Sequence, residues 1–229
     1  MPSTPVPMQL QPLFAFLANL AHHNERPWFQ ERKATYDDLR AQFIEDTEFW
    51  ARALAQLDPA LAGPEGRKSI FRIYRDVRFS KNKDPYKTHF SVYFTASAGK
   101  DVDAPGYYLQ LGPNGNTLLA GGLHQPDKAQ LAALRQEIDY NAAELKALLA
   151  APDFRRYFGG PSGDKLKKAP AGYPADHPEI ELLKHKSLTA FHHMEDAAVL
   201  SHADFRAHVV DVFRAMVPLC QFLRRAVEP

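Results

Sequence analysis

One segment of this 229-residue chain, residues 67–89, carries a strong excess of positive charge. The segment holds eight Lys or Arg against two Asp, a local formal charge of +6, whereas the rest of the chain sums to −5. Arg can donate two parallel hydrogen bonds to a phosphate or a carboxylate, so such a cluster suits an anion rich in oxygen. We therefore expect an anion-binding site in this segment.

The side chains of the segment fall into two groups by the chemistry they can perform. The candidates for binding the anion are Arg72, Arg75, Arg78, Lys81, Lys83 and Lys87, with Tyr107 from a later strand. The candidates for proton transfer are Tyr74, Asp76 and His89. The sequence predicts binding of a small phosphate- or carboxylate-bearing ligand and leaves open whether a reaction follows.

A nucleic-acid-binding module is an alternative interpretation. In that case the loop 80–87 would follow a phosphate backbone, and Tyr74, Tyr86 and Tyr93 would be available to stack on bases. The acidic remainder of the chain argues against it, because it would repel a long polyanion outside the basic segment.

A second alternative is a structural or interaction domain in which Arg72, Asp76 and Arg78 form an ion-pair network along a strand. Arg75 raises the same question, since strict alternation places it among apolar positions and a buried guanidinium needs a partner. The candidate partners are Glu25, Glu31 and Asp37. For Arg75 a structural ion pair is favoured over a ligand contact.

The remaining sequence features limit the chemistry. The histidines lack a recognised metal spacing, and the chain has no P-loop, no Rossmann glycine pattern and no Gly-x-Ser-x-Gly motif, so we expect no metal and no cofactor. His124 is a further acid/base candidate beside His89. The single cysteine, Cys220, excludes an intrachain disulfide and is expected to be a buried apolar residue.

No apolar run is long enough to span a membrane. Residues 1–12 contain no Lys or Arg, which argues against a signal peptide, so we expect a cytoplasmic protein without membrane association.

Hydrophobic periodicity predicts the elements that position the site. Helices are expected over 12–21, over 24–57 with Asn24 as the N-cap, over 126–149 with a junction at 141, shortly after Pro178, and from Ser201 as N-cap. Strands are expected over 71–79, 87–96, 107–111, 117–122 and 187–191, with a hairpin turn at 113–116.

This succession predicts an α+β fold: an antiparallel β-meander of about four to five strands packed against N-terminal, middle and C-terminal helices. Residues 12–229 are expected to form a single domain, preceded by a flexible lead-in over 1–11.

The sequence also resembles a conserved hypothetical family of bacteria and fungi, catalogued as domain of unknown function 2461. The resemblance extends from about Leu13 to Ala226 and depends most on residues 71–90, with their Arg-x-x-Arg-Asp-x-Arg-Phe-Ser-Lys core. Residues 24–29, 106–109, 121–122 and 184–187 support it, while Ala120 stands where a third glycine is frequent. The resemblance implies a member of this family and brings no activity with it.

Overall fold

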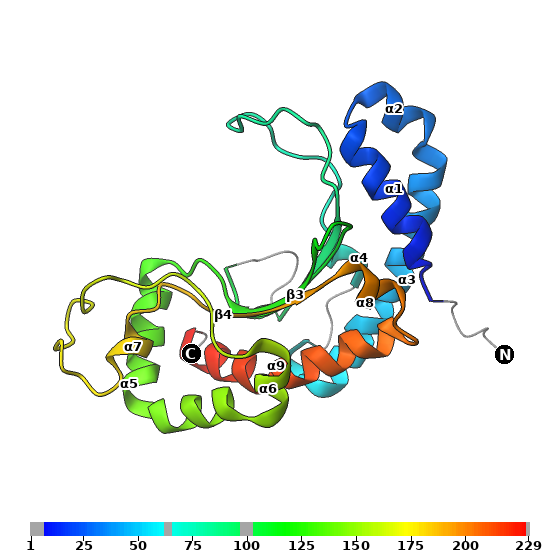
Figure 1. The fold of residues 1–229 in the computed structure, drawn as a ribbon. Helices are drawn as coiled ribbons and strands as arrows, with labels where there is room; N and C mark the ends of the chain where they lie inside the picture. The colour runs from blue at the N-terminus through cyan, green and yellow to red at the C-terminus, as the bar shows by residue number, and fades with distance from the viewer. Residues whose placement is uncertain (1–6, 62–65, 97–102, 228–229) are drawn as a thin grey trace.

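The structure of the protein is a computed structural model that describes residues 7–61, 66–96 and 103–227 (Figure 1). The first helices are α1 (Leu10–His22), α2 (Arg26–Glu31) and α3 (Lys33–Leu57), followed by the 3-10 turn η1 (Pro59–Leu61) and the short α4 (Gly66–Ser69). Then come the strands β1 (Phe90–Thr95), β2 (Gly106–Leu111) and β3 (Thr117–Leu123). The remaining elements are α5 (Lys128–Ala150), α6 (Pro152–Phe158), α7 (Ile180–Leu183), β4 (Leu188–Met194), α8 (Asp196–Leu200) and α9 (Phe205–Val227).

The four strands form one antiparallel sheet in the order β1-β2-β3-β4, so every strand pairs with its neighbour in sequence. The connection from β3 to β4 is long and carries α5, α6 and α7. The predicted α+β class and the antiparallel meander are confirmed.

Residues 112–116 connect β2 to β3. Asn114 and Gly115 in this turn both have positive φ, 63° and 69°, a conformation that Gly and Asn adopt more readily than other residues do. Their backbone N–H groups donate to the carboxylate of Asp196 at 2.7 and 2.8 Å, and this residue begins α8. The hairpin predicted at 113–116 is thereby tied to the chain that follows β4.

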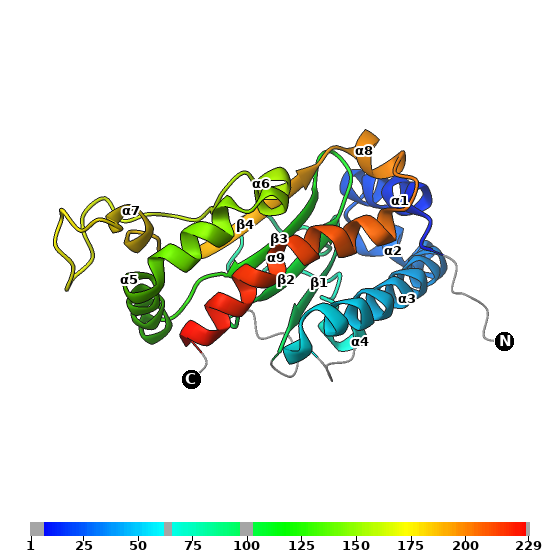
Figure 2. The same cartoon turned by 90° about the horizontal axis from the view of Figure 1, so that it is seen from below.

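Helices cover one face of the sheet. Figure 2 shows α9 crossing this face, with α3 on the β1 side and α5 and α6 on the β4 side. Phe94, Tyr107 and Phe213 meet edge to face between the sheet and α9. At Gly121 a Cβ atom would lie 2.9 Å from the side chain of Met216, so the absence of a side chain lets α9 approach the sheet closely.

A buried polar cluster joins the end of α3 to this core. The Tyr107 hydroxyl donates to Asp58 at 2.9 Å, and Arg224 of α9 donates to both oxygens of the same carboxylate at 3.0 and 2.8 Å. Burial opposes ionisation of Asp58, but the hydrogen bonds from Arg224 and Tyr107 outweigh it and lower its pKa. The Cys220 thiol, completely buried as predicted, contacts the carbonyl of Gly106 at 3.5 Å.

Several predicted helix boundaries differ from the structure. The helix expected over 24–57 is divided at Arg32 into α2 and α3, and Asn24 does not cap it. Helix α9 begins at Phe205, where the Asp204 carboxylate accepts from the N–H of Ala207 at 3.0 Å, so Asp204 rather than Ser201 caps it. Helix α5 is kinked at Asn141, whose backbone angles are not helical, at the junction that the sequence predicted.

The strand expected over 71–79 does not form; the chain there makes only isolated bridges, Ile70 to Val92 and Tyr74 to Tyr86. Of the lead-in predicted over 1–11, residues 1–6 lie outside the described chain. Met8 is buried and its N–H donates to Asp46 at 3.2 Å, so packing begins earlier than expected. Within the described ranges no helix is long and apolar enough to cross a membrane.

The Asp58 cluster predicts a clear stability effect. Tyr107→Phe removes a buried hydroxyl and leaves Asp58 with an unfilled acceptor site, which should cost about 1–3 kcal/mol of unfolding free energy. Urea denaturation followed by circular dichroism measures this loss. Tyr140→Phe is the matched control, because the Tyr140 side chain is exposed on α5. Equal stability of the two variants would contradict a structural role for the hydroxyl.

Candidate functional site

Residues 71–89, called the arm below, leave the sheet and return to it without forming regular strands (Figure 1). Its two branches are joined by backbone hydrogen bonds from Lys87 to Ile73 at 2.7 Å and from Arg75 to Pro85 at 2.9 Å. Pro85 has no N–H to donate, so the ladder cannot continue regularly. Residues 76–84 form the tip, which Figure 1 shows projecting beyond the sheet.

Asn24 anchors the arm. Its side-chain amide donates to the carbonyl of Tyr86 at 3.0 Å and accepts from the N–H of the same residue at 3.0 Å. One side chain therefore satisfies both backbone groups of Tyr86, as a neighbouring strand would. This role replaces the helix cap that the sequence predicted for Asn24.

Aromatic rings complete the anchor. The ring of Tyr86 stacks on Phe29 of α2, with centroids 4.1 Å apart and planes inclined by 16°. Tyr74, on the other branch of the arm, contacts the same two rings at 5.3 and 6.3 Å. Tyr86 is 2% exposed and Tyr74 is 46% exposed, so only Tyr74 offers a free ring surface.

The polar side chains of the tip hold its shape. Asp76 accepts from Arg78 through the guanidinium Nε at 3.0 Å and Nη2 at 2.6 Å, and from its backbone N–H at 3.2 Å. These hydrogen bonds from Arg78 lower the pKa of Asp76. Lys83 donates to the carbonyl of Val77 at 3.0 Å across the tip. Part of the predicted ion-pair network is thus present, between Asp76 and Arg78.

Arg75 does not pair with an acidic helix residue, contrary to expectation. Its guanidinium donates to the carbonyl of Asp84 at 3.1 Å and to the Ser80 hydroxyl at 3.4 Å. Both acceptors are neutral, so the positive charge of Arg75 persists on the arm. Arg72 and Lys81 are exposed and have no salt bridge in the described ranges, although the charge of Arg72 also contributes to lowering the pKa of Asp76.

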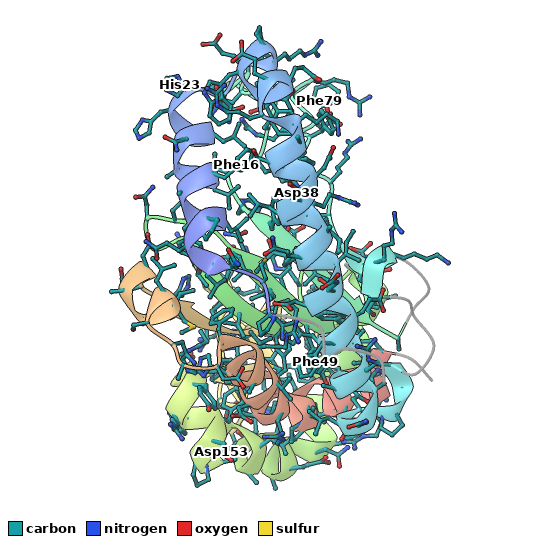
Figure 3. All side chains as sticks on the ribbon, turned by 90° about the vertical axis from the view of Figure 1, so that its right-hand side faces the viewer. Phe16, His23, Asp38, Phe49, Phe79 and Asp153 are labelled. Atoms are coloured by element: carbon teal, nitrogen blue, oxygen red, sulfur yellow. The ribbon has the colours of Figure 1, made fainter. Side chains whose placement is uncertain are left out.

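The alternating pattern that predicted a strand also misplaced Phe79. Ile73 is buried as expected, but the ring of Phe79 is 95% exposed. Figure 3 shows Phe79 at the same end of the molecule as His23. The Arg78 guanidinium lies 5.8 Å from the centre of its ring.

The three proton-transfer candidates lie in different surroundings. Tyr74 belongs to the aromatic anchor, Asp76 is paired at the tip, and His89 lines a crevice of about 10 Å³ together with Tyr36 and Phe43. Burial, assisted by the charge of Lys87, lowers the pKa of His89 to about 4. In the described part of the chain no hydrogen bond connects these three groups.

The sheet face opposite α9 carries a cavity of about 310 Å³. Tyr93, Tyr108, Ala120 and Phe191 stand in one row across the four strands, because they are directly paired in register. All four line the cavity, and its surface is mostly apolar. Cavities of this size and polarity are typical of small-molecule sites.

Phe71, the first residue of the arm, forms one wall of this cavity and meets the ring of Tyr108 edge to face at 6.2 Å. The Lys87 ammonium lies 5.1 Å from the centre of the Phe71 ring. The cavity and the basic arm therefore meet at Phe71. His124, the second histidine singled out from the sequence, and Thr189 add polar groups to the lining.

Sequence reasoning missed the cavity. Phe191 and Thr189 belong to the edge strand, and their relation to Tyr108 depends on the register of strands that are distant in sequence. The alternation along each strand was the sequence signal for this cavity. It placed Tyr93 on the face of β1 that does not point into the core.

Tyr107 lies away from both the arm and the cavity. Its ring is fully buried on the α9 side of the sheet, where its hydroxyl is bound to Asp58. Tyr107 is therefore part of the core and is not available to a ligand at the arm or the cavity. The described residues contain no group of three or more His, Cys, Asp or Glu arranged to hold a metal.

The fold and the site define an α+β protein that combines an apolar sheet cavity with a projecting basic arm. The sequence profile of the family described as "Conserved hypothetical protein (DUF2461)" matches residues 12–222, so the chain belongs to this family. No curated protein and no solved structure matches the chain.

The Asn24 anchor predicts the stability of the arm. Asn24→Ala leaves both backbone groups of Tyr86 without their partner, which should destabilise the arm locally by about 1–2 kcal/mol. Trypsin should then cleave after the basic residues of the arm several times faster than in the wild type. Asn19→Ala is the control, since Asn19 bonds only within α1. Cleavage at the wild-type rate would show that the anchor does not limit opening.

His89 predicts a dependence of stability on pH. Its pKa is about 4 in the folded protein and near 6.5 when unfolded, so the unfolded chain binds the proton more readily. The contribution of His89 is complete above pH 6.5 and is lost as the pH falls from 6.5 toward 4. When the pH is lowered from 7.5 to 5, the unfolding free energy of the wild type should fall by about 1–2 kcal/mol more than that of His89→Gln. Urea titrations at both pH values test this, with exposed His22→Gln as control; identical losses in all three proteins would refute it.

Proposed function

We propose that this protein binds a small organic anion, with the apolar part of the ligand in the sheet cavity and its carboxylate or phosphate group at the base of the arm. The observation that carries the proposal is the junction at Phe71, which is a wall of the cavity and also lies under the Lys87 ammonium at 5.1 Å. An apolar pocket with a few polar or charged groups at its edge is the usual arrangement of a ligand site.

The cavity supports the choice of ligand size and shape. Its volume of about 310 Å³ lies at the low end of the roughly 300–1,000 Å³ common for ligand pockets. The rings of Tyr93, Tyr108 and Phe191 suit a flat or branched apolar group. Inorganic phosphate by itself would leave this surface without a contact.

The charges support the anionic end of the ligand. Lys87 stands beside the cavity wall, and Arg72 follows Phe71 directly in the chain and is exposed. An anionic group bound there gains charge-assisted hydrogen bonds, which are stronger than neutral ones. Tyr74 and Asp76 do not line the cavity, so we propose ligand binding and assign no proton transfer to them.

A thermal-shift screen tests the proposal with benzoate, octanoate, phenyl phosphate and inorganic phosphate. We expect a ligand that joins an apolar group to an anion to raise the Tm, by the equivalent of about 2.7 kcal/mol at 100 times its Kd. Inorganic phosphate should have little effect. Isothermal titration then gives the affinity of the best ligand.

Two variants locate the site. Ala120→Leu adds volume to the floor of the cavity and should abolish binding of the apolar group, while Lys87→Gln should weaken binding by roughly tenfold. Lys128→Gln, on α5, is the control for a general loss of charge. The proposal is rejected if no compound of the panel raises the Tm of the wild type. It is also rejected if Ala120→Leu binds the best ligand with wild-type affinity.

A further inference from the structure

The tip of the arm presents an apolar ring to solvent. Phe79 is 95% exposed, more than Tyr140 on α5 at 72% or Tyr74 at 46%. Burying a Phe side chain is worth roughly 1.5–3 kcal/mol, and folding of this chain gains almost none of it at Phe79. The ring remains available for contact with another molecule.

The surroundings of Phe79 are fixed by the tip itself. Arg78, its neighbour, is bound to Asp76, while Arg75 donates to Ser80 and to the carbonyl of Asp84. Lys83 donates to the carbonyl of Val77. These bonds define a folded tip, so the ring and the nearby cations are presented together and at limited entropic cost.

The charge of the arm indicates the chemistry of the partner. The arm carries six Lys or Arg and two Asp, a formal charge of +4, while the rest of the chain sums to −3. An arm of this charge attracts a polyanion, whereas the acidic remainder repels one. Binding is therefore confined to a short length of an anionic polymer that meets the arm.

A polymer that satisfies both the charges and the exposed ring must be anionic and must offer flat apolar faces. Single-stranded nucleic acid does so, because its bases are unstacked and accessible between phosphates. We infer that the arm tip binds single-stranded nucleic acid, with Phe79 stacked on a base and the cations Arg72, Arg75, Lys81 and Lys83 on the phosphates. Tyr74, half-exposed at the base of the arm, offers a second stacking surface.

Fluorescence anisotropy with a labelled 12-nucleotide oligothymidylate tests this inference on the full chain. Phe79→Ala should weaken binding by about 5- to 30-fold, the effect of losing one base–aromatic stack. Since Phe79 is exposed, the variant keeps its fold, which circular dichroism verifies. Tyr140→Ala removes another exposed ring and should bind like the wild type.

Salt dependence tests the phosphate contacts. For about four cations on a single strand, raising the salt from 50 to 200 mM should lower the affinity about 50-fold. Lys81→Gln with Lys83→Gln should reduce this dependence, whereas Lys128→Gln should leave it unchanged. Ala120→Leu, which blocks the cavity, should bind the oligonucleotide normally, so failure of the ligand proposal and failure of this inference are separable.

Three results would overturn the inference. The first is no anisotropy change at any accessible concentration, and the second is equal binding by Phe79→Ala and wild type. The third is binding to vesicles containing phosphatidylserine that depends on Phe79 without binding to the oligonucleotide, which would assign the tip to a membrane surface. Inorganic polyphosphate, which has charge but no bases, should bind independently of Phe79.

Discussion

The side chain of Asn24 supplies the two hydrogen bonds that a neighbouring strand would otherwise give to Tyr86. This contact lets a chain segment leave the sheet without exposing unsatisfied backbone groups at its base. Because Phe29 stacks on the same residue, the turn between α1 and α2 and the arm are held as one unit. This attachment fixes the base of the arm against the helices, while hydrogen bonds of Arg75, Arg78 and Lys83 hold the tip.

The two faces of the sheet have different surroundings. On the α9 side, the buried carboxylate of Asp58 binds Tyr107 and Arg224 and joins α3, β2 and α9 into the core. On the opposite side, the row containing Tyr108 and Ala120 lines the cavity. Alternation along β2 thus sends neighbouring residues, Tyr107 and Tyr108, to opposite surroundings.

Local pattern predicted the sheet and most helices because one face of each element is buried. It failed on the arm, where alternation predicted a strand with Phe79 inside; the structure there is fixed by the side chain of Asn24, 62 residues from Tyr86, which no periodicity reveals. The same holds for the cavity, whose row of side chains requires the register of β4 with β3. The cluster of charge and the pairing of Asp76 with Arg78 could be predicted from the sequence, but the separate crevice that contains His89 could not.

The lone thiol of Cys220 lies where the sheet meets α9 and has no exposed surface, and burial raises its pKa to about 12. A thiol in this state is neither ionised nor accessible to an alkylating reagent at neutral pH. Labelling can proceed only when α9 separates from Gly106 and the strands beneath it. The rate of Cys220 labelling therefore measures global opening of the protein. It does not respond to motions of the arm, because the thiol lies on the other side of the sheet.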